Sequence, residues 1–136
     1  MEFRWDEAAA EAYRRDATTA LLWRPAPCLI VTRVIGPASI DLLRFYMAHA
    51  ERAMASGRLR VFHDWSEMTR YEPGARDALK RWGREHNADF VRVTYLVDSK
   101  VIAMLISVAA LTMGRELAAT TDRAEFLAEL SAALAA

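Results

Sequence analysis

From residue 37 to the end of the chain, segments with helical periodicity alternate with short β-prone runs. The runs at 60–64, 90–97 and 117–120 are rich in apolar or β-branched residues, and each is followed by a segment of helical character. Strands that alternate with helices are joined as parallel neighbours, because each helix returns the chain to the edge where the previous strand began. The alternation therefore predicts a single-domain α/β fold with a mixed, mostly parallel β-sheet and flanking helices.

Two more strands are expected upstream. Residues 18–23 and 28–34 are β-prone, and Pro25 and Pro27 lie between them. Prolines at these positions force a turn, so we expect an antiparallel hairpin. Residues 6–15 are alanine-rich, with acids first and arginines last, the order that suits a helix dipole. We therefore predict an N-terminal helical extension, residues 1–17, followed by the domain at 18–136.

The helices predicted within the domain each have an apolar face. Glycines and prolines mark their limits, with Gly57 after the first helix, Pro73 opening the second and Gly114 after the third. Asp122, with Glu125 three residues later, predicts a capped start for the last helix. The expected buried faces are Ile40, Leu43, Met47, Ala50 and Met54; Ala75, Ala78, Leu79, Trp82 and His86; and Phe126, Leu127, Leu130 and Leu134.

Composition excludes several classes of function. The 136 residues carry 18 basic and 18 acidic side chains, so no overall field favours nucleic acid. The single cysteine, Cys28, excludes an intrachain disulfide and a cysteine-based zinc cluster. The three histidines lack metal-ligand spacing, and no nucleotide-binding fingerprint is present. The apolar run 101–113 is shorter than the roughly 20 residues that a membrane span needs. We expect a cytoplasmic, non-membrane domain without metal or cofactor.

The segment LRVFHDWSEMTRYEPG, residues 59–74, carries the predicted site. An apolar strand is expected to end at Asp64, followed by a polar loop and a helix that opens at Pro73. Together with the later strand VRVTYLVDS and the helix start TDRAEFLAEL, this order resembles the STAS domain of anti-sigma-factor antagonists. The resemblance extends to the branch related to lipid-binding CRAL-TRIO domains. It implies a STAS-like fold and a binding role.

The same resemblance exposes a departure. Regulatory members of that family carry a phosphorylatable serine at the start of the helix after this loop. Here Glu72, Pro73 and Gly74 occupy the place and offer no hydroxyl group. We therefore predict a STAS-like domain without the usual serine-phosphorylation switch.

The predicted partner-binding site combines the end of the strand with the helix after it. His63 and Asp64 should point to opposite faces of the sheet, and Asp64 should accept hydrogen bonds from the following residues. Three cations on the helix recur every four residues and so share one face, which is either a solvated surface or a docking strip for an acidic protein or a lipid phosphate. The predicted residues are Asp64, Ser66, Arg70, Glu72, Arg76, Lys80 and Arg84.

The third helix is apolar on all sides, so its outer face should also be covered. Burial within the monomer, a homodimer interface and an apolar ligand are the alternatives, and two-fold dimers dominate soluble assemblies. The residues predicted for this dimer or apolar-ligand face are Val101, Met104, Leu105, Val108 and Leu111.

The hypothesis is a non-enzymatic regulatory or scaffolding domain that binds a protein partner and forms a homodimer. One alternative is a carrier or sensor of an apolar or lipid ligand beside the third helix. A further alternative is an unrecognised enzyme that uses the residues after Asp64, although no nucleophile with a catalytic context stands out.

Overall fold

The protein forms one six-stranded sheet in the order β1-β2-β3-β4-β5-β6, with helices on both faces. This computed structural model describes the backbone of residues 1–113 and 116–136 and the side chains of residues 1–104, 106, 107 and 116–136. The strands are β1 (Glu11–Arg15), β2 (Thr18–Ala26), β3 (Leu29–Ala38), β4 (Leu59–Tyr71), β5 (Phe90–Leu96) and β6 (Leu117–Thr120). The helices are α1 (Ile40–Met54), α2 (Pro73–Glu85), α3 (Lys100–Met113) and α4 (Arg123–Ala135), with short 3-10 turns at Glu7–Ala9 and Asn87–Asp89.

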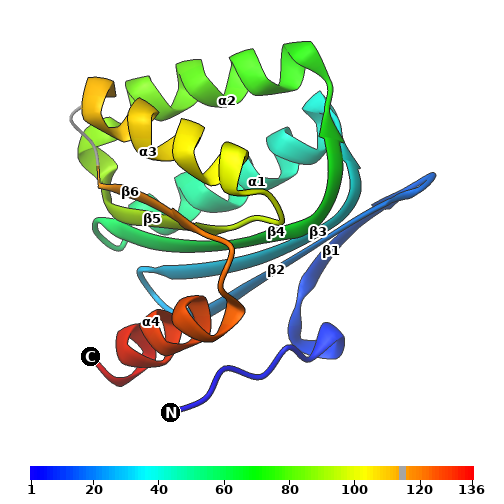
Figure 1. The fold of residues 1–136 in the computed structure, drawn as a ribbon. Helices are drawn as coiled ribbons and strands as arrows, with labels where there is room; N and C mark the ends of the chain where they lie inside the picture. Colours follow the sequence, from blue (N-terminus) through cyan, green and yellow to red (C-terminus); the bar gives the residue numbers. More distant parts are fainter. Residues whose placement is uncertain (114–115) are drawn as a thin grey trace.

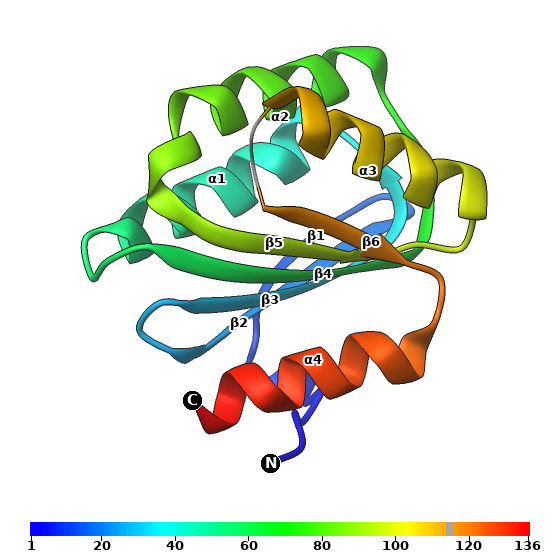
Figure 2. The same cartoon turned by 60° about the vertical axis from the view of Figure 1, so that its left-hand side comes forward.

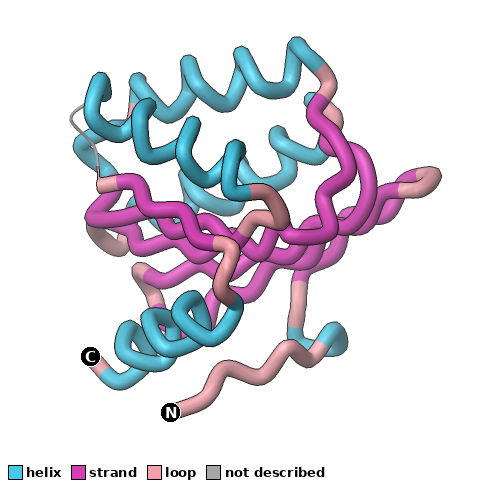
Figure 3. The backbone as a smooth tube through the Cα atoms, in the orientation of Figure 1, coloured by secondary structure: helices cyan, strands magenta, loops and turns pink. Residues whose placement is uncertain are grey.

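The strand order determines where the helices lie. β1, β2 and β3 pair antiparallel, whereas β3, β4, β5 and β6 follow one another as parallel neighbours. Right-handed crossovers that always advance in one direction place their helices on the same face of a sheet. Accordingly α1, α2 and α3 cover one face, and α4 lies on the other together with the N-terminal segment (Figures 1 and 2). The tube in Figure 3 shows the sheet as a layer between these two groups.

Each face of the sheet has its own apolar core. On the side of α1 and α2 the core includes Leu59, Val61 and Trp82, all buried. On the side of α4 it includes Phe62 and Phe126, whose ring centroids are 5.8 Å apart. β3 and β5 are apolar along most of their length, as expected of strands that are covered on both faces.

Most of the predicted elements are confirmed, including the antiparallel hairpin, the strand at 117–120 and the four helices of the domain. The predicted start of α4 is also present, since Oδ1 of Asp122 accepts hydrogen bonds from the backbone N–H groups of Ala124 and Glu125 at 2.9 and 3.4 Å. Of the predicted apolar faces, Leu43, Ala50, Ala75, Trp82, Phe126 and Leu130 are fully buried, and the remaining members are partly exposed.

The predicted N-terminal helix is wrong. Residues 11–15 form β1, which pairs antiparallel with β2, and only Glu7–Ala9 form a short 3-10 turn. The segment has little apolar surface for a helix to bury, and pairing its backbone with the edge of β2 satisfies groups that a docked helix would leave open on β2. The turn of the hairpin is also displaced, because β2 continues to Ala26 and Cys28 lies in the turn.

The predicted end of the strand at Asp64 is wrong as well. β4 continues for seven more residues, to Tyr71, and the segment expected as a polar loop remains paired with β3. Two register shifts along this pairing bend the strands, so that the last part of β4 rises toward the start of α2 (Figure 1). Asp64 therefore lies in the middle of the strand and inside the sheet.

Candidate functional site

β4 places His63 and Asp64 on opposite faces of the sheet, as strand geometry requires. His63 lies on the side of α1, where its Nδ1 is 2.6 Å from Oγ1 of Thr32. Its ring contacts the rings of Tyr46 and Trp65 with centroid distances of 4.9 and 4.3 Å. His63 is thus part of an aromatic core, and it cannot act together with Asp64.

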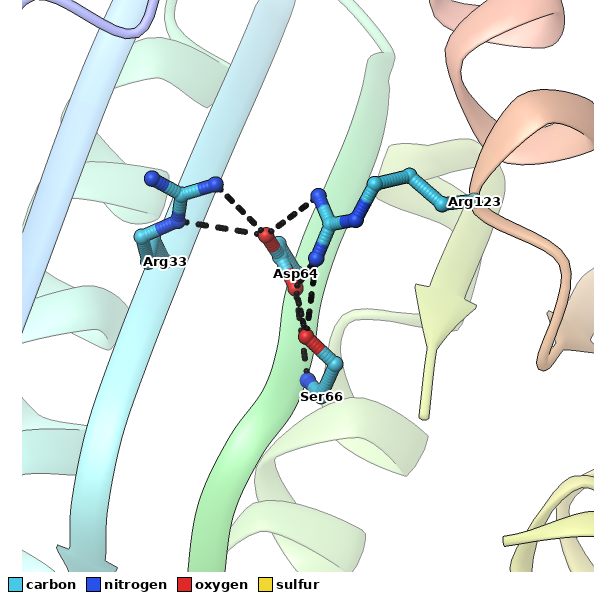
Figure 4. Close-up of polar contacts among 4 residues, drawn as sticks. All are labelled: Arg33, Asp64, Ser66 and Arg123. Atoms are coloured by element: carbon cyan, nitrogen blue, oxygen red, sulfur yellow. Dashed lines mark hydrogen bonds and ion pairs between the residues drawn. The ribbon is translucent and has the colours of Figure 1, made fainter. Parts of the chain in front are cut away.

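Asp64 is the centre of a polar cluster on the side of α4 (Figure 4). Its side chain is 1% exposed and its Oδ2 accepts hydrogen bonds from Nε and Nη2 of Arg33 at 3.2 and 3.0 Å. Arg123, from the first turn of α4, donates from Nη1 to Oδ2 at 3.1 Å and from Nη2 to Oδ1 at 3.4 Å. Ser66 donates to Oδ1 from its hydroxyl at 2.6 Å and from its backbone N–H at 3.3 Å.

The cluster is closed on itself. The Ser66 hydroxyl also accepts a hydrogen bond from Nη2 of Arg123 at 3.0 Å, and the guanidinium of Arg33 lies over the ring of Trp5 at 4.4 Å. The predicted hydrogen bonds from the residues after Asp64 are therefore present, together with two arginines that were not predicted. Both oxygens of the carboxylate thus accept hydrogen bonds, as a buried charge requires.

The surroundings of Asp64 make it a poor base. Burial by itself would raise the pKa of the Asp64 carboxyl, but the hydrogen bond from Ser66 and the guanidinium groups of Arg123 and Arg33 outweigh it and hold the pKa below its ordinary value. A general base works best with a pKa near the operating pH. The hydrogen bond from the Ser66 hydroxyl to Oδ1 is one of the contacts that stabilise the charged carboxylate.

The predicted partner-binding set is split by the sheet. Asp64 and Ser66 lie on the side of α4, whereas Arg76, Lys80 and Arg84 are exposed on α2, on the opposite side. Arg70 is exposed near the end of β4. Glu72 precedes α2 and makes no side-chain capping hydrogen bond. The structure therefore does not bring the predicted residues together into one site.

The outer surface of α2 is basic. α2 buries Ala75, Trp82 and Gly83, so its outer surface carries Arg76, Lys80 and Arg84 in a row, with Arg81 beside it. None of these four forms an ion pair with a described residue, although Asp77 and Glu85 lie on the same helix.

α3 lies next to α2 on the same side of the sheet (Figures 1 and 2). Val101 and Met104, in its first turns, are 61% and 60% exposed, and Ile102 is 44% exposed. Of the residues predicted for a dimer or apolar-ligand face, Val101 and Met104 are not covered within the monomer, whereas the side chains of Leu105, Val108 and Leu111 lie outside the described residues. We call the surface formed by Arg76, Lys80, Arg84, Val101 and Met104 the α2–α3 face.

The described residues contain neither a metal-ion cluster nor a membrane-spanning helix. No group of three or more His, Cys, Asp or Glu side chains is arranged to hold a metal ion in the described part of the chain. No described helix is both long and apolar enough to cross a membrane.

The sequence held one signal for the two arginines that the prediction missed. Arg33 is the only charged residue within the run CLIVTRVI, and a charge in a strand buried on both faces needs a partner. In the structure Arg33 is the register partner of Asp64 on the neighbouring strand. Arg123 gave no comparable signal, because it lies in a polar helix start.

Comparison with solved structures identifies the fold. A protein of the DUF3478 family from Shewanella loihica PV-4, described as having a SpoIIAA-like fold, superposes with a TM-score of 0.65 at 16% identity, over 90% of this chain and 92% of its own. The anti-sigma factor antagonist SpoIIAA, in its unphosphorylated form, superposes with a TM-score of 0.54 at 12% identity, over 90% of this chain and 98% of its own. The chain has a STAS-like, SpoIIAA-like fold.

The predicted STAS-like fold is therefore confirmed over nearly the whole chain. No family model matches the sequence, and the comparison with curated proteins gives no match. At these identities the similarity defines the fold alone and does not define a function.

Proposed function

We propose that this protein is a non-enzymatic regulatory or scaffolding domain that binds an acidic protein partner through its α2–α3 face. The observation that carries the proposal is the row of cations on α2, which form no ion pair with a described residue, together with the exposed apolar residues of the neighbouring helix α3. Cations that lack partners within their own chain are available to a partner of opposite charge, and complementary charge gives specificity and a fast association rate.

Two features support a binding role without catalysis. Both carboxylate oxygens of Asp64 accept hydrogen bonds from within the chain, and the pKa of the carboxyl is held below its ordinary value. By the resemblance to STAS domains, Glu72, Pro73 and Gly74 stand where the regulatory members carry a phosphorylatable serine. A STAS-like domain of this kind would bind its partner constitutively, without a serine switch at that position.

The proposal is tested by site-specific cross-linking in cells that express the protein. A photoactivatable amino acid at the position of Lys80 should yield one discrete adduct, whose yield falls when Arg76 is changed to Glu. The control is the same photoactivatable group at Ala132, which is exposed on α4, on the other side of the sheet. An adduct of equal yield from both positions, or none from position 80, would contradict the proposal.

A carrier of an apolar ligand is the second candidate, and one observation favours it. The indole Nε1 of Trp65 is buried and has no hydrogen-bond partner among the described residues, a cost that an acceptor on a ligand would remove. Trp65 lies on the side of the sheet that α3 covers, 5.0 Å from the ring of Tyr95. Native mass spectrometry of gently purified protein tests this candidate, because a carrier should retain a bound apolar molecule.

A further inference from the structure

We infer that the α2–α3 face also binds an anionic membrane surface, so that a bilayer and the protein partner exclude one another there. The inference rests on the proposed docking face, but it concerns a different occupant.

The first step is the distribution of charge. The whole chain has as many acidic as basic residues, yet α2 has four basic residues against two acids, and α3 adds Lys100 and no acid. The two helices thus carry a net positive charge that the rest of the molecule balances. Basic clusters of this kind are attracted to anionic headgroups within a Debye length of the surface.

The second step is the position of the apolar residues. Val101 and Met104 are the most exposed large apolar side chains of the described part of the chain after Met1. They lie in the first turns of α3, and both α2 and α3 begin at the edge where β4 and β5 end (Figures 1 and 2). Val101 and Met104 therefore lie toward the same edge of the sheet as Arg76, which is in the first turn of α2.

This combination fits an interface between water and lipid. Interfacial binding adds the burial of a few apolar side chains to electrostatic attraction, and neither contribution alone is sufficient for a short segment. The exposed side chains here are aliphatic. Lys100, beside Val101, can extend its ammonium group toward the headgroups while its methylene chain stays with the apolar residues.

A second copy of this chain is a weaker occupant of the same face. A two-fold interface uses one patch twice, so it would bring two sets of unpaired cations out of water with few acids to pair them. An anionic bilayer supplies the missing negative charge and an apolar layer together. The observations therefore favour the bilayer.

The test is sedimentation of the purified protein with vesicles. Vesicles of phosphatidylcholine with 30% phosphatidylglycerol should bind the protein at about 50 mM salt, and binding should be lost at about 500 mM salt, where screening is strong. Vesicles of phosphatidylcholine alone should bind it weakly or not at all. Equal binding to both vesicles, or no binding to either, would overturn the inference.

Paired variants separate the two contributions. Lys80→Gln with Arg84→Gln should weaken binding about 25-fold, because each basic residue near an anionic surface contributes about fivefold. The matched control is Arg4→Gln with Arg60→Gln, which removes two exposed arginines away from this face and should leave binding unchanged. Val101→Ser with Met104→Ser should also weaken binding, without changing its salt dependence. An equal loss in the control pair would overturn the inference.

The outcome is independent of the proposed protein partner. If vesicles do not bind but the cross-linked adduct forms, the membrane inference fails and the proposed function stands. If vesicles bind and no adduct forms, the membrane inference stands and the proposed function fails. Circular dichroism of each variant verifies that it is folded before its binding is compared.

Discussion

The side chain that most restricts the chemistry of this molecule is Asp64. A carboxylate that is almost fully buried is stable only where charge and hydrogen bonds compensate for the lost water, and here Arg33, Arg123 and Ser66 provide both. Because Arg123 belongs to α4, the cluster also attaches that helix to the sheet. The packing of α4 against the sheet therefore depends in part on the charge of Asp64.

Replacing Asp64 by Asn should destabilise the protein by about 2–4 kcal/mol at neutral pH, since it removes the charge shared by two arginines that remain partly buried. The folded pKa of Asp64 lies below its unfolded value. Its stabilising contribution is thus complete above the unfolded pKa and is lost as the pH falls through the folded pKa. Urea unfolding of both proteins at pH 7 and at pH 3 should show the difference shrinking in acid.

If the wild type and Asp64→Asn differ in their free energy of unfolding by the same amount at pH 7 and at pH 3, the prediction is contradicted, because the charge of Asp64 would then contribute nothing to stability. The control is Arg123→Gln, which leaves Asp64 paired with Arg33 and should cost less than Asp64→Asn.

Trp82 is the second residue for which the structure sets a magnitude. It is 8% exposed, its ring lies 5.6 Å from that of Tyr46 and 5.7 Å from that of Phe90, and its Nε1 donates to Glu51 at 2.8 Å. Trp82→Ala should cost about 3–5 kcal/mol through lost burial and a cavity. Trp82→Phe, which keeps most of the apolar contact and loses the hydrogen bond, should cost much less. An unchanged denaturation midpoint for Trp82→Ala would disprove the burial of this face of α2.

The contacts of Asp64 are of two kinds, those that the sequence alone can predict and those that it cannot. The contact between Asp64 and Ser66 is local, and the separation of His63 from Asp64 follows from strand alternation, so both were predictable. The partners Arg33 and Arg123 are 31 and 59 residues away from Asp64. Their contacts depend on strand register and on the face chosen by α4, neither of which a local pattern contains.

At the scale of elements, the sequence predicts segments that bury an apolar face better than segments that do not. α1, α2 and α4 were predictable from helical spacing, and β5 from its continuous β-branched run. The second half of β4 was missed because Glu67, Thr69 and Arg70 are exposed, so their polarity resembles that of a loop. Pairing with β3 keeps this segment extended regardless of its polarity. β1 was missed for a similar reason, since its pattern is polar on an exposed edge.

Gly36 of β3 lies where the backbone requires a glycine. Gly36 has a φ of +93°, and a Cβ there would lie 2.3 Å from the carbonyl oxygen of Ala17. Gly36→Ala should therefore cost about 1–3 kcal/mol from backbone strain, and more if the turn before β2 has to move. Thermal unfolding measures the change.

The control is Gly74→Ala in the first turn of α2, where the new methyl group would meet only the flexible end of Ile40, at 3.1 Å. It should change the stability much less than Gly36→Ala. Equal effects of the two substitutions would show that the conformation of Gly36 is not a constraint on the sheet.

At the scale of the whole molecule, the sheet separates two different surfaces. On the side of α4, Arg92 pairs with Glu129 at 2.7 Å and with Glu116 at 3.1 Å. On the side of α2 and α3, the cations of α2 form no ion pair with a described residue, and Val101 and Met104 are exposed. A neutral molecule whose basic residues are unevenly distributed has a preferred orientation toward a charged partner.

The oligomeric state in solution tests whether the α2–α3 face binds a second copy of the chain. The sequence leads to the expectation of a homodimer through α3. The structure adds the unpaired cations of α2, which a two-fold interface over the whole α2–α3 face would desolvate twice. We therefore expect light scattering to give the mass of a monomer at tens of micromolar, both for the wild type and for Met104→Glu. Ala132→Glu, which adds the same charge on the exposed side of α4, is the matched control and should also be monomeric. The wild type could instead be a dimer that Met104→Glu converts to a folded monomer and that Ala132→Glu leaves intact. That result would show that this face forms a homodimer, and it would contradict membrane binding there.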